Sequence, residues 1–428
     1  MMRSDSQIKL ARKDAPPVTF AAHWWGFTIS LSEAATQLLN DFDKIAGQII
    51  ESIGDELTEG VAELVVAYIK LRTAVIKLED NGSGIKLVSP WIAPTLLIPF
   101  PNDAHFDDGQ LRWSVYSDGS GWSDEVKMNN DYTEDGPSLA VHDEKLFCVA
   151  RGAIGDETLY WMYYDIPDVV DGQTHGTSGT WTSYAPIRQI NNLNQGAQSQ
   201  QSPGLASYNG QLWCVYQGAG SSTAPIYVAT FNFNDYDPND PNKSGWTVNA
   251  APIPNVQTNG APAVAVYRGI LVCVYVGADN ALYSIGYNPS SGWGESARLD
   301  GTWAGYGEST ALCVYNDRLY CVYRGGHGNY WYAILDDQSW RFGNSSQVPG
   351  GVSSTDGPFM AVFEGKMLVA HRSNGNDETI YVCTFDGSNW TDVPISGVKS
   401  AKRPGIVHYQ QPGATQDQLL MMHRGIST

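Results

Sequence analysis

The chain has 428 residues, with 45 Asp and Glu against 26 Lys and Arg, so its formal net charge at pH 7 is −19. A surface this acidic argues against nucleic acids and anionic membranes as partners, because both carry negative charge of their own. The length exceeds that of one typical domain and predicts two.

Residues 1–22 are expected to form a flexible N-terminal arm. The first twenty residues, MMRSDSQIKLARKDAPPVTF, contain no apolar run of the kind found in a signal peptide. We therefore expect synthesis in a reducing compartment, so that the protein is cytoplasmic or is released by a route that no signal peptide directs.

Residues 23–100 are expected to form a helical hairpin with flanking β segments. Ser30 and Glu33 have the spacing of a capping box, and apolar residues then recur every three or four positions up to Ile53. The apolar stripe of a second helix comprises Val61, Leu64, Tyr68, Leu71, Val75 and Leu78. This second helix is too charged to span a bilayer.

Two β segments flank the helices, one starting at His23 and one at Gly84; the second could pair with the first or pack across the helices. Trp24, Trp25 and Trp91 lie in these segments, and their ordinary role is to pin β segments onto helices. The alternatives are a surface for a protein partner or for homo-oligomerisation, and a membrane-active head of the toxin type. The phrases HWWG and PWIAP resemble an uncharacterised microbial domain, and this resemblance implies no function.

A short phrase recurs along the rest of the chain. Its six copies begin at Gly136, Ser202, Gly260, Glu308, Gly357 and Arg403. Apolar residues alternate on both sides of a tight turn such as Asn209-Gly210 or Glu364-Gly365, which predicts a β-hairpin. An aromatic-rich run and a recurrent Trp follow, and they predict a third and a fourth strand.

Four strands in each repeat indicate the blades of a β-propeller, here over residues 101–428. The last copy ends after two strands, whereas residues 109–128 match the third and fourth strands of a repeat. One blade built from both ends would remove the free sheet edges that invite aggregation. The expected fold is therefore mainly β, a six-bladed propeller closed by strands from both ends, with a small N-terminal helical unit.

The six cysteines are expected to be reduced and buried. Cys148, Cys214, Cys273 and Cys321 occupy one column of the predicted second strands. Equivalent positions in different blades lie beyond the Cα separation of about 7 Å that a disulfide allows. Neither the cysteines nor the histidines have zinc spacing, and the acidic loop from Asp235 departs from a calcium loop, so we expect no metal and no cofactor.

Two columns of side chains are candidates for binding. The residue that ends the second strand is arginine in four copies, and Gln217 and Val276 in the other two; the third strand supplies Tyr227, Tyr283 and either Trp331 or Tyr332. Acids or amides such as Asp279 lie between the columns. The predicted carbohydrate-binding residues are Arg151, Asp156, Tyr160, Arg324, Asn329, Trp331, Arg372, Asp377, Tyr381, Arg424 and Arg112.

An arginine fork, an aromatic face and an acid or amide suit a sugar, because a pyranose offers hydroxyl pairs for hydrogen bonds and a C–H face for stacking. Several modest sites of this kind would bind a glycan-covered surface with avidity. The structural alternative is that the arginines form salt bridges between blades and the tyrosines fill space. The loss of arginine at Gln217 and Val276 indicates that not every cleft binds.

The phrases CVYRG…NYWY, CVARG…ETLYW and DGSNW resemble the repeats of tandem-repeat β-propeller lectins of bacteria and fungi, including the fucose-binding kind. The resemblance covers residues 107–428. It implies a multivalent glycan-binding module whose sites lie between blades and use Arg, an acid and aromatic residues. The GPxLAVYNGxLYxVxRG form departs from the consensus of the fucose lectins, so no sugar is implied.

A glycoside hydrolase is the competing class. SDGSGW and FDGSNW lack the Ser-x-Asp-x-Gly frame of sialidase Asp-boxes, and the arginines here are repeated instead of forming one unique triad. The acids near the predicted sites also recur with the repeat, which favours binding over a single catalytic carboxylate pair. We therefore expect a lectin without catalytic residues, with a sialidase-like hydrolase or a protein-binding propeller scaffold as the alternatives.

Overall fold

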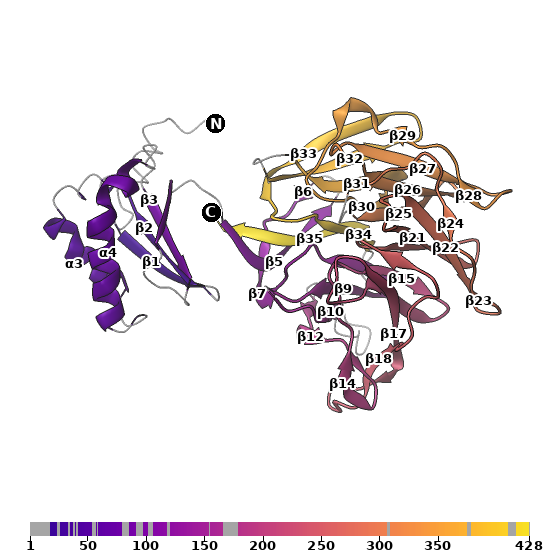
Figure 1. The fold of residues 1–428 in the computed structure, drawn as a ribbon, viewed down its shortest axis with the longest axis horizontal. Helices are drawn as coiled ribbons and strands as arrows, with labels where there is room; N and C mark the ends of the chain where they lie inside the picture. The colour runs from indigo at the N-terminus through magenta and orange to yellow at the C-terminus, as the bar shows by residue number, and fades with distance from the viewer. Residues whose placement is uncertain are drawn as a thin grey trace. The chain divides into compact units, whose positions relative to one another are not determined.

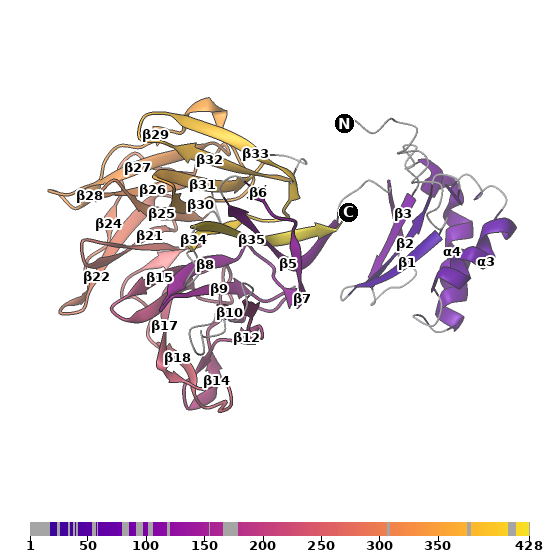
Figure 2. The ribbon, with the colours of Figure 1, turned by 180° about the vertical axis from the view of Figure 1, so that it is seen from behind.

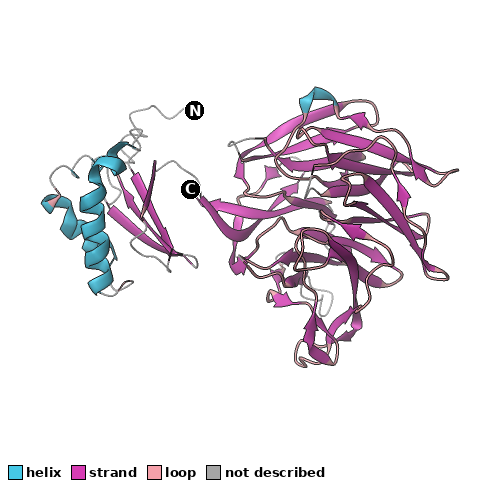
Figure 3. Cartoon of the chain, in the orientation of Figure 1, coloured by secondary structure: helices cyan, strands magenta, loops and turns pink. Residues whose placement is uncertain are grey.

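The computed structural model describes residues 18–23, 26–32, 35–36, 39, 42–53, 57, 59–78, 85–90, 97–101, 106–117, 120–153, 155–165, 179–305, 309–374, 378–409 and 417–427. The chain divides into two compact units, residues 1–108 with 427–428, and residues 109–426. Strands make up nearly all of the second unit, and the long helices lie in the first (Figure 3). The protein is therefore mainly β.

The first unit contains one antiparallel sheet with the strand order β1-β2-β3-β4. Its strands and long helices are β1 (Val18–His23), β2 (Gly26–Leu31), α3 (Asp43–Ile53), α4 (Glu59–Leu78), β3 (Ile85–Pro90) and β4 (Ile98–Pro101). The β segment that follows the helices pairs with β2, as Phe27 opposite Ser89 shows. β1 includes residues 18–22 of the expected arm, because they pair with β2 from Val18 opposite Leu31 onwards.

The helices cover the sheet through a stripe that differs from the predicted one. Ala62, Val65, Ile69 and Ile76 of α4 are buried in the core of this unit, whereas Leu64 and Leu71 of the predicted stripe are exposed. The helix is apolar on more than one side, so the spacing of its apolar residues does not identify the buried face. Packing against the sheet decides which face is buried. The prediction was therefore wrong for Leu64 and Leu71, whereas Val61 and Tyr68 of the predicted stripe pack against this core.

The first helix also begins later than predicted. Ser30 lies in β2 opposite Lys86, so it is a strand residue and caps no helix. The cap-like contact comes from Ser32, whose Oγ accepts a hydrogen bond from the N–H of Ala35 at 3.2 Å. The long helix α3 starts only at Asp43. Sheet pairing displaced the predicted capping box, because an N-cap is followed directly by helical residues, whereas Leu31, which follows Ser30, is paired with Ile85 in the sheet.

In the second unit each repeat forms an antiparallel sheet, and we number these sheets 1 to 6 along the chain. Sheet 1 contains β8 (Ser138–His142), β9 (Lys145–Arg151), β10 (Leu159–Asp165), β11 (Thr180–Trp181) and β12 (Ala185–Pro186). Sheet 2 contains β15 (Gly204–Tyr208), β16 (Gln211–Gln217), β17 (Ala224–Tyr236), β18 (Ser244–Val248) and β19 (Gln257–Thr258). A two-stranded sheet of β13 (Arg188–Gln189) and β14 (Asn192–Gly196) lies between them in the chain.

The next three sheets repeat the pattern. Sheet 3 contains β20 (Ala263–Tyr267), β21 (Ile270–Val276), β22 (Leu282–Asn288), β23 (Gly292–Trp293) and β24 (Ala297–Arg298). Sheet 4 contains β25 (Thr310–Tyr315), β26 (Arg318–Arg324), β27 (Tyr330–Asp336), β28 (Arg341–Phe342) and β29 (Ser346–Gln347), and the 3-10 turn η2 (Pro349–Gly351) follows it. Sheet 5 contains β30 (Phe359–Phe363), β31 (Lys366–Arg372), β32 (Thr379–Phe385) and β33 (Trp390–Lys399).

Sheet 6 combines strands from both ends of the unit. Its strand order is β34-β35-β5-β6, and β7 also pairs with β5. The strands are β34 (Gly405–Tyr409), β35 (Gln418–Ser427), β5 (Phe106–Ser117), β6 (Gly121–Trp122) and β7 (Val126–Tyr132). The first strands of successive sheets contact one another in the order β8, β15, β20, β25, β30, β34, and β34 in turn contacts β8. Figures 1 and 2 show the sheets of this unit from two opposite sides.

The predicted hairpin turns are present. Asn209 and Gly210 have φ values of 54° and 71°, and Glu364 and Gly365 have 47° and 68°. Two successive positive φ angles define the type I′ turn, whose twist matches that of the paired strands. All six cysteines are free and buried, as predicted, and burial raises the pKa of the Cys313 thiol to about 12.

The approach of sheet 6 to sheet 1 requires a glycine at position 136. A Cβ added there would collide with the backbone carbonyl oxygen of Arg403, in the segment that enters β34. We predict that Gly136→Ala lowers the free energy of unfolding by about 1–3 kcal/mol, the usual cost of overpacking. Chemical denaturation measures this cost.

Gly294→Ala is the control for that substitution, because the atom nearest to its added Cβ is the carbonyl oxygen of Gly286 at 3.6 Å. This control should change stability little. Equal effects of the two substitutions would contradict a tight contact between sheets 6 and 1.

Candidate functional site

The predicted aromatic column lies on the third strand, directly opposite the second strand. Tyr227 pairs with Tyr216, Tyr283 with Tyr275, Trp331 with Tyr323 and Tyr381 with His371. This register assigns the column in sheet 4 to Trp331 and not to Tyr332. In sheets 2, 3 and 5 the two rings of the cross-strand pair are stacked, with centroid separations from 5.5 to 6.0 Å.

The glycine that follows the second strand makes room for this column. A Cβ added at Gly218 would be 2.8 Å from the ring of Tyr227, and one added at Gly325 would be 2.8 Å from Trp331 Nε1. Gly277 and Tyr283 repeat the arrangement. In sheet 6 the side chain of Arg112 lies over Gly425 in the same way. The third-strand side chains therefore also serve as packing.

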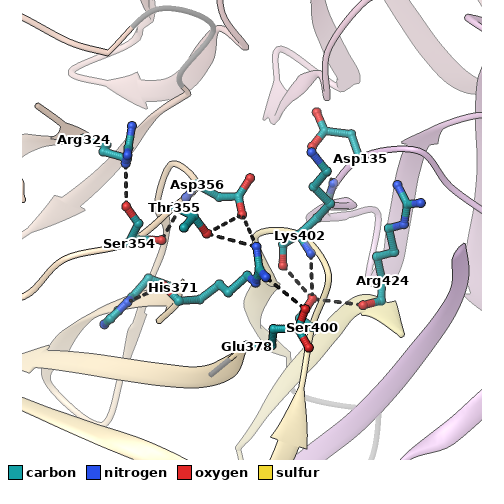
Figure 4. A network of polar contacts seen from close by, with 12 residues as sticks. Asp135, Arg324, Ser354, Thr355, Asp356, His371, Glu378, Ser400, Lys402 and Arg424 are labelled. Atoms are coloured by element: carbon teal, nitrogen blue, oxygen red, sulfur yellow. Dashed lines mark hydrogen bonds and ion pairs between the residues drawn. The ribbon is translucent and has the colours of Figure 1, made fainter. Parts of the chain in front are cut away.

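In three of the six sheets the residue at the end of the second strand donates to the segment that leads into the next sheet. Arg324 Nε donates to the carbonyl oxygen of Ser354 at 2.6 Å, ahead of sheet 5 (Figure 4). Arg424 Nη1 donates to the carbonyl oxygen of Glu134, ahead of sheet 1. Gln217 is fully buried, and its Nε2 donates to the carbonyl oxygen of Thr258 at 2.9 Å, ahead of sheet 3.

Arg372 has different partners. Its Nη1 donates to Thr355 Oγ1 at 3.0 Å and lies 3.5 Å from Asp356 Oδ2, and its Nη2 donates to Glu378 Oε1 at 3.2 Å. The guanidinium is thus held between two carboxylates. Asp377, the acid predicted to join this arginine, lies outside the described residues.

Arg151 and Arg112 complete the predicted set. Arg151 is half-buried and has neither a hydrogen bond nor an ion pair with any residue in the described part of the chain. Arg112 Nη1 lies 3.9 Å from Glu125 Oε2, and His423 Nε2 hydrogen-bonds the same carboxylate.

A second histidine–acid pair repeats this contact in sheet 5, where His371 Nε2 and Asp392 Oδ1 are 3.0 Å apart. Both buried histidines directly precede the arginine of the column, in the phrases HRS and HRG. Sequence reasoning missed these two pairs, although the shared His-Arg phrase was the available signal.

Sheets 1 and 3 bring the predicted acid and tyrosine together. The hydroxyl of Tyr160 donates to Asp156 Oδ2 at 2.8 Å, and that of Tyr283 donates to Asp279 Oδ2 at 3.1 Å. The nearby arginine of sheet 3 is Arg298 on β24, whose Nε lies 3.7 Å from Asp279 Oδ2. The acid–tyrosine pairs therefore exist, but this arginine comes from the fourth-strand side of the sheet.

The electrostatics of Asp156 reflect this arrangement. Burial raises its pKa, but hydrogen bonds from Thr158 and Tyr160 and the charge of Arg188 outweigh burial and lower the pKa below the usual value. The carboxylate is therefore stabilised in its ionised form.

An open cleft lies on sheet 4, and we call it the sheet-4 cleft. It has a volume of about 530 Å³ and is lined by Gly301, Trp303, Tyr323, Gly325, Gly326, His327, Asn329 and Trp331. Trp303 is 67% exposed. Ala304 forms a β-bridge with Gly325, which holds Trp303 beside Gly326. Trp303 lies outside the repeated Trp column. Its position as an extra Trp in the repeat was the signal from which sequence reasoning could have found it.

A second cleft occupies the equivalent place on sheet 2, and we call it the sheet-2 cleft. Its volume is about 310 Å³, and its lining includes Gln198, Tyr216, Gly218, Tyr227 and Asn249. Ser199 bridges Gly218 as Ala304 bridges Gly325, so Gln198 stands where the sheet-4 cleft has Trp303. The two clefts share their aromatic floor and differ in the residue that precedes the bridge.

Within the described residues, no group of three His, Cys, Asp or Glu side chains is arranged to hold a metal ion. Among the described helices, none is both long and apolar enough to cross a membrane.

No family model and no curated protein matches the chain. Solved structures do match. AofleA from Arthrobotrys oligospora is 9% identical, with 80% of this chain and 86% of that one covered and a TM-score of 0.48. The Aleuria aurantia lectin in complex with Fucα1-6GlcNAc is 12% identical, with 67% and 86% covered and a TM-score of 0.42.

A hydrolase also matches: the α-L-arabinanase of Penicillium chrysogenum, complexed with arabinobiose, is 14% identical, with 67% and 92% covered and a TM-score of 0.45. The likeness to lectins that the repeats carry is thus also found among solved structures, beside a likeness to hydrolases. With TM-scores below 0.5, these likenesses carry no conclusion about the family or function of this chain.

The contacts of the arginine column yield a stability prediction. Arg424 is buried and donates to the loop that enters sheet 1, whereas Arg151 has no partner among the described residues. We predict that Arg424→Ala lowers the free energy of unfolding by about 1.5–3 kcal/mol, the range for a hydrogen bond to a charged group. Arg151→Ala should cost clearly less in the same denaturant titration. If Arg151→Ala is the more destabilising, the structural role assigned to the column is wrong.

Proposed function

We propose that the second unit is a six-bladed β-propeller lectin that binds glycans without turning them over, and that its principal site is the sheet-4 cleft. The cyclic order of contacts among the first strands supports the propeller, with sheet 6 as the blade shared by both ends. The free, buried cysteines support synthesis in a reducing compartment.

The single observation that carries the proposal is the placement of Trp303 and Trp331 in one cleft with His327 and Asn329. Indole faces pack against the C–H face of a sugar, and the indole N–H remains a donor at the ring edge. The amide of Asn329 and the imidazole of His327 can donate to and accept from neighbouring hydroxyls. The volume of about 530 Å³ lies within the range of small-ligand sites.

The sheet-2 cleft supports binding at more than one place. It offers the rings of Tyr216 and Tyr227 and the amides of Gln198 and Asn249, which is the same combination of stacking and hydrogen bonding. Two such clefts on one unit would bind a surface of repeated glycans more tightly than either alone. In this proposal the repeated arginines hold the sheets together, and Arg151 is the member of the column left for a ligand.

Glycoside hydrolysis is the alternative function. A hydrolase pairs a carboxylate with a carboxylic acid whose pKa is raised so that it can protonate the leaving group. Asp156, which stands beside Tyr160 at one predicted site, instead has its pKa lowered by hydrogen bonds and Arg188 against the effect of burial. This environment favours an acceptor for sugar hydroxyls over a general acid.

We predict that Trp303→Ala raises the Kd for any glycan found on an array by about tenfold, which corresponds to about 1.4 kcal/mol. The loss follows from removing a stacking face that is mostly exposed and therefore contributes little to the fold. Isothermal titration calorimetry measures the affinity. Trp340→Ala is the matched control, because Trp340 is 39% exposed and lies outside the sheet-4 cleft. Unchanged affinity in Trp303→Ala would refute this site.

We further predict no release of product from a panel of aryl glycosides, including arabinosides, fucosides and sialosides, at any pH at which the protein stays folded. Binding is to be measured on the same preparation. Hydrolysis that disappears on Asp156→Asn would establish the hydrolase alternative. If the protein neither binds nor hydrolyses any glycan of a broad array, the lectin proposal is refuted and a protein-binding scaffold becomes the favoured function.

A further inference from the structure

Helix α4 of the first unit carries an exposed apolar stripe on the side opposite its buried one. Leu64 is 58% exposed and Leu71 is 84% exposed, and Ala67 and Ala74 between and beyond them are exposed as well. One exposed leucine is ordinary on a protein surface. Four apolar residues aligned along a 20-residue helix that already buries another face are not.

The spacing of the stripe indicates the kind of partner. Leu64, Ala67, Leu71 and Ala74 follow one another at intervals of three, four and three residues. This is the seam that one helix presents to another helix in a coiled-coil pair, where each side chain enters a gap between side chains of the partner. The leucines are large enough to enter gaps on a partner helix, and the small alanines leave space for the partner's leucines.

The charges beside the seam indicate the orientation. Glu63 and Lys70 are exposed and lie on the same edge of the stripe, seven residues apart. In an antiparallel pair of identical helices, like edges meet, so Glu63 of one copy faces Lys70 of the other, and the reverse contact follows by symmetry. The same alignment places Leu64 of one copy beside Ala67 of the other, so that a leucine faces the smaller side chain. The ammonium of Lys70 lies 5.6 Å from the ring of Phe42 within its own copy, which leaves it at the edge of the seam.

We propose that a second copy of this chain docks on this face, with α4 packed antiparallel against α4 of the partner. The contact is isologous, because each helix supplies the same leucines and the same acid–base pair. The inference does not depend on the proposed function. If both hold, the dimer would carry twice the number of glycan clefts and would bind surfaces with greater avidity.

Sedimentation velocity of the full chain tests the proposal, since each chain has a mass of 46.7 kDa and the dimer has twice that. The wild type should sediment as a dimer at micromolar concentration. Leu64→Glu combined with Leu71→Glu should weaken the dimer at least a hundredfold, because two buried carboxylates would face apolar side chains. Leu193→Glu is the control, since Leu193 is 41% exposed and lies in the second unit.

The control variant should remain a dimer, and circular dichroism should confirm that all variants fold. A monomeric wild type would overturn the proposal. That outcome includes the case in which another segment of the same chain covers the exposed stripe of α4. A dimer that survives the double substitution would overturn it as well.

Cysteine crosslinking tests the orientation, and the six native cysteines give little background because they are buried. A mixture of Leu64→Cys and Ala67→Cys proteins should form disulfide-linked dimers on mild oxidation, whereas each alone should do so at least several-fold less. The reverse result would indicate a parallel pair and refute the antiparallel one. Glu63→Lys and Lys70→Glu should each weaken the dimer a few-fold, and the double exchange should restore it.

Discussion

In three sheets of the second unit, one contact ties the end of the second strand to the segment that leads into the next sheet. Gln217, Arg324 and Arg424 each donate a side-chain N–H to a backbone carbonyl of that loop. A buried acceptor left without a partner costs about 1–3 kcal/mol. In these three sheets the position therefore requires a long side chain that donates, whereas Val276 occupies it in sheet 3 without a donor. Gln217 makes this hydrogen bond without a charge. Arg324 and Arg424 therefore serve here as long hydrogen-bond donors with a structural role.

The side chains that make this structural contact are therefore different from those that line the open clefts. The clefts on sheets 2 and 4 lie over Gly218 and Gly325, where the missing Cβ lets a third-strand ring lie against the backbone. The residue before the bridging position then determines the lining: Gln198 in one cleft and Trp303 in the other. Chemistry that suits a ligand thus arises where the repeats differ, while the features they share hold the sheets together.

The first unit obeys a different constraint. One face of α4 must cover the sheet, and Val65, Ile69 and Ile76 fill that role beside Ile45 and Ile49 of α3. A second apolar face on the same helix adds nothing to this core. A surface helix ordinarily turns a polar face to solvent, and this departure is the reason that we propose the second face as the interface to another copy. The two units would then divide the work between assembly and recognition.

The sequence by itself determined the repeat, its hairpins and turns and the buried cysteines, and it narrowed the aromatic residue of sheet 4 to Trp331 or Tyr332. Each of these follows from neighbours a few residues apart, through strand alternation and turn conformation. Only the tertiary structure decided which stripe of α4 is buried, which partner each arginine has, and that Trp303 joins Trp331. These contacts connect segments tens of residues apart, and their formation depends on packing between sheets, which no local periodicity records.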